Sequence, residues 1–460
     1  MLPGSRPFPV GLPWRHALMA LLVGLWACAL LGGLFLEDLW AWSAGLLYVG
    51  YDTWLIGYVA WRTWDLRPAG PEVPRAPSLG VIVPARNEAA MLPACLDALL
   101  AQTDPAERIL LADDGSTDHS AVMLRSRYGL SAAPGLVHST IHPGLSLLRL
   151  PHGGKARALN AAWPELDTDL VVTLDADTLL APEALAALRQ AFGRDPELAA
   201  AGGVLKPRCG HGVNARLFEW FQEFEYLRAF LSRAAWMRAD ALLLVSGAFA
   251  VFRLEVLRKL GGFRDDSLVE DYELIHRLHR HAHDHGLAWR VGVVGEARAV
   301  TDAPASLRSF LRQRRRWFAG FLQTQFANRD MTGNPRYGAV GRLMLPVKTV
   351  DTLQPLFGLT AFGLLLWFLA SGSPVALPVL LVIGAKLLVD FCYHLWALHL
   401  YYRWLGTPMP PLSWPRAVAA TLAEPFSFQL LRHAGACLGW LSYLTGRLDW
   451  SPRQLTGKPS

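Results

Sequence analysis

Residues 171–177 read Val-Val-Thr-Leu-Asp-Ala-Asp, and this stretch predicts the fold of the middle of the chain. Four residues with high β-propensity lead directly into two carboxylates. Such a run is typical of a buried parallel strand, whose carboxyl end opens into the cleft where α/β sheets bind ligands. Asp175 and Asp177 are one residue apart and could share a hard divalent cation, Mg²⁺ or Mn²⁺, which commonly links protein to phosphate.

The same alternation continues on both sides of this stretch. The sequence predicts strands at residues 79–83, 108–112, 145–150, 170–174 and 242–245. Helical patterns follow at residues 91–102, 155–162, about 215–230, from 269 and at 307–326. Strands separated by helices predict βαβ units and a parallel sheet, hence an α/β fold.

Two apolar blocks lie outside this α/β region. Charged residues make up 18% of the chain, below the usual quarter, and the shortfall falls before about residue 62 and after about residue 340. Residues 18–36 carry no charge and residues 39–61 carry only Asp52; each stretch is long enough to cross a bilayer. Arginines flank this hairpin on both sides, which predicts a cytoplasmic location for the middle of the chain.

The second block predicts further membrane helices. No charge occurs in residues 352–385, and a Ser-Gly-Ser-Pro break at residues 371–374 divides the run. Residues 417–444 are interrupted by Glu424-Pro425, and this stretch could span the membrane, re-enter it or lie at its surface. Lys386 and Asp390 are four residues apart inside an apolar run, a spacing that favours an ion pair, although intramembrane charges are also functional candidates.

The overall charge points to a lipid partner. The net charge is +6, and the basic residues concentrate beside the apolar segments, so anionic membrane lipid is a better partner than nucleic acid. The five cysteines are scattered singly, which argues against both a disulfide framework and a cysteine metal site.

Two motifs before residue 171 suit a nucleotide. Asp113-Asp114-Gly115 follows a predicted strand; this is a common turn, but a carboxylate there could accept the N3–H of uracil. Gly153-Gly154-Lys155 opens a helix, and its N-terminus with a cation suits a phosphate, although an ordinary helix start reads the same way. The spacing of a P-loop is missing, so an NTPase is a poor interpretation.

Two later motifs carry further chemistry. Glu270-Asp271 could be acids that favour a helix start or could supply a base. The Gln-Arg-Arg-Arg-Trp run at residues 313–317 could be the solvated face of an amphipathic helix, or a cation and a flat ring for a sugar diphosphate. His279 and His283 lie one turn apart, but we expect a polar surface helix there rather than a zinc site.

Taken in order, these motifs resemble the membrane-embedded family 2 glycosyltransferases, a group that includes the cellulose, hyaluronan and poly-N-acetylglucosamine synthases and ceramide-glucosyltransferase-like relatives. The shared motifs are Asp113-Asp114-Gly115, Asp175-Ala176-Asp177, Val269-Glu270-Asp271 and Gln313-Arg314-Arg315-Arg316-Trp317, together with residues 81–88 and 154–160. Val269 stands where threonine is common in the family.

The resemblance implies a GT-A fold, a Rossmann-like nucleotide-diphospho-sugar transferase domain, and a donor that is usually UDP-linked. It also implies a role for each motif. Asp113 or Asp114 would lie on the uracil side, Lys155 near the diphosphate, and Asp175 and Asp177 on the nucleotide and its Mg²⁺ or Mn²⁺. Asp271 would be the general base with Glu270 beside it, Gln313 and Arg316 would bind the diphosphate, and Trp317 the acceptor.

We therefore expect an integral protein of the bacterial inner membrane with a cytoplasmic catalytic domain. The expected parts are a transmembrane hairpin at 1–62, a Pro-rich linker at 63–78, a GT-A domain at 79–303, interface helices at 304–350, transmembrane helices at 351–446 and a tail at 447–460. The expected activity is inverting sugar transfer to a growing polysaccharide. The alternatives are a single addition to a lipid acceptor and, remotely, a non-catalytic scaffold or transporter.

Overall fold

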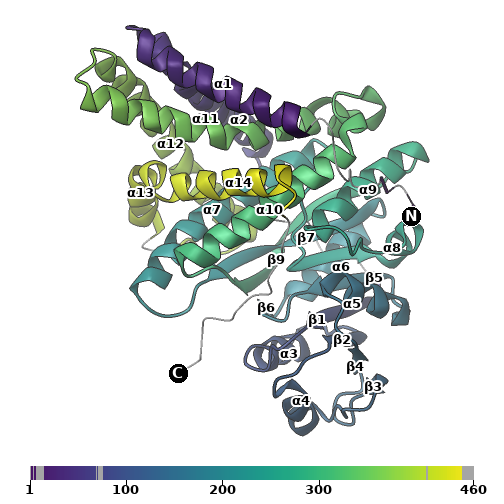
Figure 1. The fold of residues 1–460 in the computed structure, drawn as a ribbon. Coiled ribbons are helices and arrows are strands. Elements are labelled where there is room, and N and C mark those ends of the chain that lie inside the picture. Colours follow the sequence, from purple (N-terminus) through teal and green to yellow (C-terminus); the bar gives the residue numbers. More distant parts are fainter. Residues whose placement is uncertain are drawn as a thin grey trace.

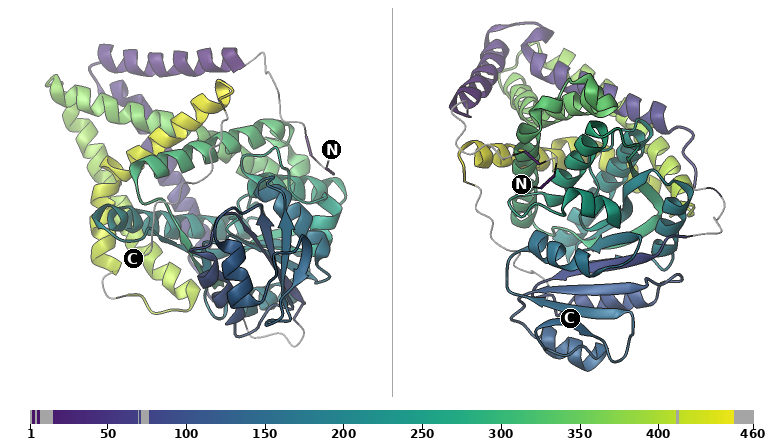
Figure 2. Two further views of the ribbon diagram at one scale, coloured as in Figure 1. Left: turned by 60° about the horizontal axis from the view of Figure 1, so that its bottom comes forward. Right: turned by 90° about the vertical axis from the view of Figure 1, so that its right-hand side faces the viewer.

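The computed structural model describes residues 2–3, 5–6, 15–68, 70, 76–410 and 413–447. An α/β domain packs against a group of long apolar helices, and both views in Figure 2 place the sheet on one side of the molecule and these helices on the other. Residues 69 and 71–75 of the predicted Pro-rich linker and the predicted tail beyond residue 447 lie outside the described residues.

The centre of the domain is a nine-stranded sheet in the order β3-β4-β2-β1-β5-β8-β7-β9-β6 (Figure 1). The strands are β1 (Leu79–Ala85), β2 (Arg108–Asp114), β3 (Gly135–His138), β4 (Leu145–Leu150), β5 (Leu170–Leu174), β6 (Thr178–Leu180), β7 (Leu198–Arg208), β8 (Phe249–Arg253) and β9 (Arg290–Asp302). The predicted strands β1, β2, β4 and β5 run parallel to one another, as expected. β3, β6 and β8 pair antiparallel with their neighbours, so the sheet as a whole is mixed.

The strand predicted at residues 242–245 is also absent from the sheet. Leu243 and Val245 are fully buried, so their apolar character reflects core packing rather than pairing with a neighbouring strand. The strand that follows, β8, begins at Phe249 and takes the place between β5 and β7. A short apolar run cannot by itself distinguish a buried loop from a buried strand.

Each face of the sheet supports its own hydrophobic core, because successive side chains of a strand point to opposite faces. Val81 and Val83 of β1 pack on one side and Ile82 on the other. Helices α3 (Leu92–Leu100), α4 (Ser120–Tyr128) and α6 (Ala184–Arg194) contribute to the first core. Helices α5 (Lys155–Ala162), α8 (Leu254–Leu260) and α9 (Glu270–Asp284) contribute to the second, so α5 and α9 begin on the same side of the sheet.

Three further helices connect the α/β domain to the apolar helices: α7 (Val213–Arg238), α10 (Leu307–Ala327) and α14 (Phe428–Leu444). Helix α10 begins one residue after Ser306, whose hydroxyl accepts the N–H of Ser309 in a capping box. Its Phe310 is fully buried and its ring centroid lies 4.8 Å from that of Phe428. The apolar face of α10 is therefore covered by α14, which is preceded by α13 (Ser413–Ala423) and a short turn at the predicted break.

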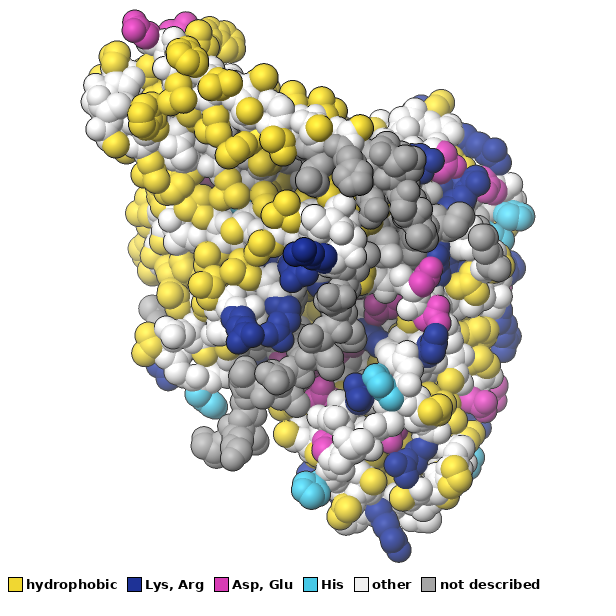
Figure 3. All heavy atoms as spheres, viewed as in Figure 1, with side chains coloured by type: hydrophobic (Ala, Val, Ile, Leu, Met, Phe, Trp, Pro, Cys, Tyr) yellow, Lys and Arg dark blue, Asp and Glu magenta, His cyan; other side chains and the backbone are white. Residues whose placement is uncertain are grey.

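The apolar helices are α1 (Arg15–Phe35), α2 (Ser43–Thr63), α11 (Leu345–Ala370) and α12 (Ala376–Leu405). Within the described part of the chain, the segments Val340–Ala370 and Ala376–Leu405 are long and apolar enough to cross a membrane. Both follow the α/β domain, so the spanning hairpin at 1–62 stays a prediction. Figure 3 shows hydrophobic side chains gathered over this part of the molecule, where Leu25, Trp367 and Leu381 are among the exposed ones.

Charged side chains meet inside this helix group. Lys386 pairs with Asp390 on α12, which confirms the predicted pair, and its Nζ also lies 2.7 Å from a carboxylate oxygen of Asp52 on α2. The three residues line a pocket of about 110 Å³ that Tyr48 and His433 also border. An ion pair in apolar surroundings ties the two helices to each other, since separating it would leave a bare charge in a low-dielectric medium.

Candidate active site

Asp113 and Asp114 are the last two residues of β2, and both are buried. The Asp114 carboxylate accepts the backbone N–H groups of Gly153 at 2.7 Å and Gly154 at 3.0 Å, and lies 2.8 Å from the Nδ1 of His152. Asp114 therefore fixes the loop that opens α5. The Asp113 carboxylate accepts the N–H of Ser116 at 3.0 Å, a side-chain turn that keeps it at the strand end.

Lys155 is the first residue of α5 and the centre of a charge cluster. Its Nζ lies 2.6 Å from Asp175 Oδ1 and 3.4 Å from Glu270 Oε1, and it donates to the carbonyl of Gly247 at 3.1 Å. Burial lowers the pKa of Lys155, but the negative charges of Asp175 and Glu270 raise it by more, so the net shift of the pKa is upward. The lysine therefore stays a cation, and three motifs that are far apart in sequence meet around it.

The two carboxylates of the Asp-x-Asp motif have different surroundings. Asp175 follows β5 directly, and its side chain is about one-third exposed. Asp177 is 4% exposed, and one of its carboxylate oxygens lies 3.5 Å from the hydroxyls of both Thr178 and Thr301. The strand end thus leaves Asp175 partly exposed beside Lys155, while Asp177 is buried against Thr301 of β9.

A divalent cation fits Asp175 with help from a bound ligand. Among the described residues, no three His, Cys, Asp or Glu side chains are grouped closely enough to hold a metal ion by themselves. Mg²⁺ needs only one or two carboxylates when phosphate oxygens complete its coordination. A metal at Asp175 would therefore depend on a diphosphate, and Lys155 would have to share Asp175 with it.

Asp271 lies beside this cluster, in the first turn of α9. Its Oδ2 accepts the N–H of Gly247 at 2.7 Å, and its Oδ1 lies 2.7 Å from the N–H of Tyr272. Burial raises the pKa of Asp271, and the charge of Glu270 raises it further, while Lys155 lowers it. A partly buried carboxylate with a raised pKa beside a lysine cation is a typical acid–base group.

The Gln-x-x-Arg-Trp motif lies on α10. Arg316 Nη1 donates to the carbonyl of Leu268 at 3.0 Å, so the motif touches the loop that leads to Glu270. The buried Gln313 Oε1 accepts no hydrogen bond from the described residues, and an unpaired buried acceptor suits a ligand donor. Trp317 is partly buried, and the guanidinium of Arg314 lies 4.5 Å from its ring centroid.

The structure therefore brings Lys155, Asp175, Glu270 and Asp271 into one cluster, and their roles stay a prediction. Asp114 joins it through the Gly153–Gly154 backbone rather than directly. Arg316 approaches it from α10 through Leu268. The motif order in the sequence predicted this set, whereas the contacts depend on chain crossings that no local pattern encodes.

Sequence reasoning missed two residues at this site. Gly247 accepts from Lys155 and donates to Asp271, and a Cβ there would lie 3.0 Å from the Asp271 carboxylate, so this close approach requires glycine. Arg233 on α7 is the second: burial lowers its pKa to about 10, against the charges of Tyr226 and Asp271. A Ser-Gly turn before a strand was the only available signal for Gly247, and Arg233 had none.

The prediction of a polar surface helix is wrong for two histidines of α9, whereas His285 at its end is exposed, as expected. His276 and His279 are buried, and they hydrogen-bond to the carbonyls of Tyr272 and Leu242 respectively. Burial lowers the pKa of His276 to about 3 and also lowers that of His279, so both stay neutral. These two side chains are buried instead of ending in solvent.

The chain is similar in sequence to known glycosyltransferases. The family model described as Glycosyl transferase family 2 matches residues 80–261. Hyaluronan synthase of Streptococcus pyogenes is 29% identical over 264 residues, which are 56% of this chain and 60% of the synthase. An N-acetylglucosaminyltransferase of Rhizobium sp. (strain N33) is 28% identical over 336 residues, 68% of this chain and 67% of that protein.

The fold has a similar solved structure. A mannosyltransferase from Pyrobaculum calidifontis, in complex with GDP-Man and Mn²⁺, matches with a TM-score of 0.53 and 22% identity, covering 83% of this chain and 99% of that one. At this identity the similarity concerns the fold. Together with the strand order, it shows a GT-A fold, and within this fold residues 80–261 match the glycosyl transferase family 2 model.

Proposed function

We propose that the protein is an inverting, metal-dependent glycosyltransferase that moves a sugar from a nucleotide-diphosphate donor, a UDP-sugar, to a growing polysaccharide at the cytoplasmic membrane face. The observation that carries the proposal is the meeting of Asp271, Glu270, Lys155 and Asp175 at the carboxyl end of β5. A base, a cation and a metal-type carboxylate within one cluster are the groups that glycosyl transfer from a diphosphate requires.

In the proposed reaction Asp271 takes the proton of the acceptor hydroxyl. That hydroxyl has a pKa far above neutral, so it needs a positioned base as its oxygen attacks the anomeric carbon. The bond from that carbon to the diphosphate breaks, and the departing diphosphate gains negative charge. Lys155 and Arg316 would stabilise this charge. We propose a single displacement, which inverts the anomeric centre.

The bound ions and the donor have proposed positions. Asp175, with Asp177 behind it, would hold Mg²⁺ or Mn²⁺, which when bound withdraws charge from the leaving diphosphate. Asp113 would lie on the uracil side, and the loop fixed by Asp114 would face the diphosphate. Gln313 would accept a hydrogen bond from a hydroxyl of the nucleotide sugar on its unpaired buried Oε1, and Trp317 would pack its ring face against the acceptor sugar.

We further propose a location in the membrane, with α11 and α12 spanning it and the GT-A domain on the cytoplasmic side, where nucleotide sugars are made. The domain boundaries stay as the sequence predicts them, with the catalytic domain at 79–303 between the two membrane parts. The named functions of the similar proteins, a hyaluronan synthase and an N-acetylglucosaminyltransferase, support a polysaccharide or oligosaccharide acceptor.

A second candidate is a single sugar addition to a lipid. The observation that favours it is the small number of qualifying spans, two in the described part of the chain, which is few for a polymer channel. In that case the acceptor headgroup would reach the site beside α10 and α14.

Product size after incubation of the purified protein with labelled UDP-sugars and Mg²⁺ or Mn²⁺ decides between these activities. A ladder of long products supports the polysaccharide synthase. A lipid carrying one labelled sugar, even under excess donor, supports the single addition. If no UDP-sugar or other nucleotide sugar yields a labelled product, the proposed function is wrong.

A further inference from the structure

We propose that Gln323 on α10 is a positioning residue for the base, acting through the backbone of residues 266–268 that leads to Glu270 and Asp271. The inference rests on the proposed function, because the residue that it positions is the proposed base. Gln323 belongs to none of the sequence motifs, and it does not reach the charge cluster itself.

The contacts of Gln323 are all with that backbone. Its Oε1 accepts the N–H of Leu268 at 3.1 Å, and its Nε2 donates to the carbonyl of Asp266 at 3.2 Å. The residue is 7% exposed. Residues 264–268 lie in no helix or strand, so their polar groups depend on side chains for partners. The side-chain amide of Gln323 thus makes the hydrogen bonds that a neighbouring strand would make in a sheet, and it makes them just before α9 begins.

The same face of α10 reaches the site at two more positions. Arg316, Gly320 and Gln323 are spaced i, i+4 and i+7, which places them on one helix face. Arg316 donates to the carbonyl of Leu268, and a Cβ at Gly320 would lie only 2.6 Å from Cγ2 of Val269. Helix α10 therefore packs directly on the residue that precedes Glu270.

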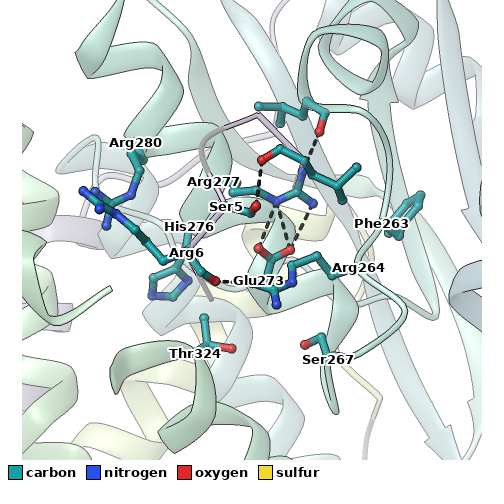
Figure 4. A network of polar contacts seen from close by, with 12 residues as sticks. Ser5, Arg6, Phe263, Arg264, Ser267, Glu273, His276, Arg277, Arg280 and Thr324 are labelled. Atoms are coloured by element: carbon teal, nitrogen blue, oxygen red, sulfur yellow. Dashed lines mark hydrogen bonds and ion pairs between the residues drawn. The ribbon is translucent and has the colours of Figure 1, made fainter. Parts of the chain in front are cut away.

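Other side chains anchor the beginning of this loop. The buried Arg277 pairs with Glu273 along α9 and donates to the carbonyls of Leu260 at 2.6 Å and Gly262 at 2.7 Å (Figure 4). Asn160 holds both backbone groups of Phe263, each at 2.7 Å. These contacts fix the turn after α8, several residues before the base, so the end of the loop needs its own support.

Gln323 and Arg316 divide that support. In the proposed reaction Arg316 turns to the diphosphate and gives up the carbonyl of Leu268. Gln323 then keeps residues 266–268 on α10 while the base works. Because an error of about 1 Å in a reacting group can cost roughly 100-fold in rate, a loose loop end would show in turnover rather than in donor affinity.

The test replaces Gln323 with methionine, which has a similar volume and neither hydrogen bond. We expect the kcat for sugar transfer to fall about 10- to 100-fold, with the KM for the UDP-sugar nearly unchanged. The acid limb of the pH–rate profile should move to lower pH, because a loosened loop admits water to Asp271 and relieves the burial that raises its pKa. The groups that face Asp271, namely Glu270, Lys155 and Arg233, are unchanged in the variant.

Gln102 offers a matched control. It is 6% exposed, accepts the N–H of Leu185 at 3.1 Å and donates to the carbonyl of Ala181 at 2.8 Å, so it bridges backbone groups just as Gln323 does, but at α6. Gln102→Met should lose comparable stability while keeping kcat and the pH profile. If Gln323→Met matches Gln102→Met in stability, in kcat and in the pH profile, the positioning role is refuted.

A second variant covers the case in which Gln323→Met does not fold. Gly320→Ala adds a methyl group against Val269, so it should displace the same backbone and give the same loss of kcat and the same shift of the acid limb. Normal turnover in that variant would contradict the inference. Failure of the proposed function looks different, since the unmodified protein would then transfer no sugar.

Discussion

Replacing Asp271 with asparagine tests the proposed base most directly. The substitution keeps the size and one acceptor oxygen but removes the ability to take a proton. The Asp271 carboxylate lies beside Lys155 and receives the N–H groups of Gly247 and Tyr272, so its position is set by the fold and not by a substrate. The contacts that the nucleotide sugar would make with Asp175 and Arg316 should therefore survive.

The size of the effect follows from the role of the base. A positioned general base contributes about 10²- to 10⁴-fold to the rate, which is about 3 to 5.5 kcal/mol of the barrier. Stability should change less, since two effects oppose each other. Removing a buried charge with a raised pKa is favourable, whereas the asparagine amide cannot accept both N–H groups, and one unpaired buried donor costs about 1 to 3 kcal/mol.

The pH dependence has a defined sign. Because the folded-state pKa of Asp271 is raised, the folded protein binds this proton more tightly than the unfolded chain does. The wild type should therefore lose stability relative to Asp271→Asn as pH rises from the ordinary pKa of aspartate through the raised value. Below the ordinary value, the carboxyl is neutral in both states and this difference disappears.

The assay compares sugar transfer, UDP-sugar affinity and thermal unfolding of Asp271→Asn with those of Asp284→Asn. Asp284 lies at the other end of α9, where it pairs with Arg336 at 2.9 Å, so it controls for the loss of an acid from the same helix. Asp271→Asn should lose at least about 100-fold in kcat with donor affinity within about threefold. Retained turnover in Asp271→Asn would refute the assignment of the base.

Three further outcomes are expected. Lys155→Met removes the cation at Asp175 and should weaken UDP binding at least about tenfold, as measured by calorimetry. An unchanged affinity would show that Lys155 does not contact the diphosphate. Chelation with EDTA should abolish transfer and added Mn²⁺ should restore it, whereas in Asp175→Asn the Mn²⁺ concentration for half-maximal rate should rise; a rate that is indifferent to chelator would exclude the metal. Lys386→Met leaves Asp52 and Asp390 without their cation and should lower the free energy of unfolding by about 3 to 5 kcal/mol. The measurement is the unfolding temperature in detergent, which should fall while the affinity for UDP is retained. An unchanged unfolding temperature would mean that this ion pair does not stabilise the fold.

Much of the site could be predicted because its residues follow strand ends or open helices. Asp113, Lys155 and Asp175 each stand at such a boundary, and the boundaries are encoded locally by β-prone runs, glycines and helix-favouring residues. The carboxyl ends of parallel strands converge on one edge of a sheet, so the cluster followed from the βαβ pattern. The limit of this reasoning appears just before β8, where a buried apolar run at 242–245 resembled a strand although only tertiary packing decides whether it pairs.

The sequence by itself determined the order of the motifs, the parallel half of the sheet, the apolar helices and the pairing of Lys386 with Asp390, because all of these depend on local periodicity or on close spacing. Only the tertiary structure decided that Asp175 is partly exposed beside Lys155 while Asp177 lies against β9, and that Asp52 joins the intrahelical pair. It also decided that Gln323 supports the backbone before the proposed base. These contacts join residues tens to hundreds of positions apart, and no local preference encodes such a distance.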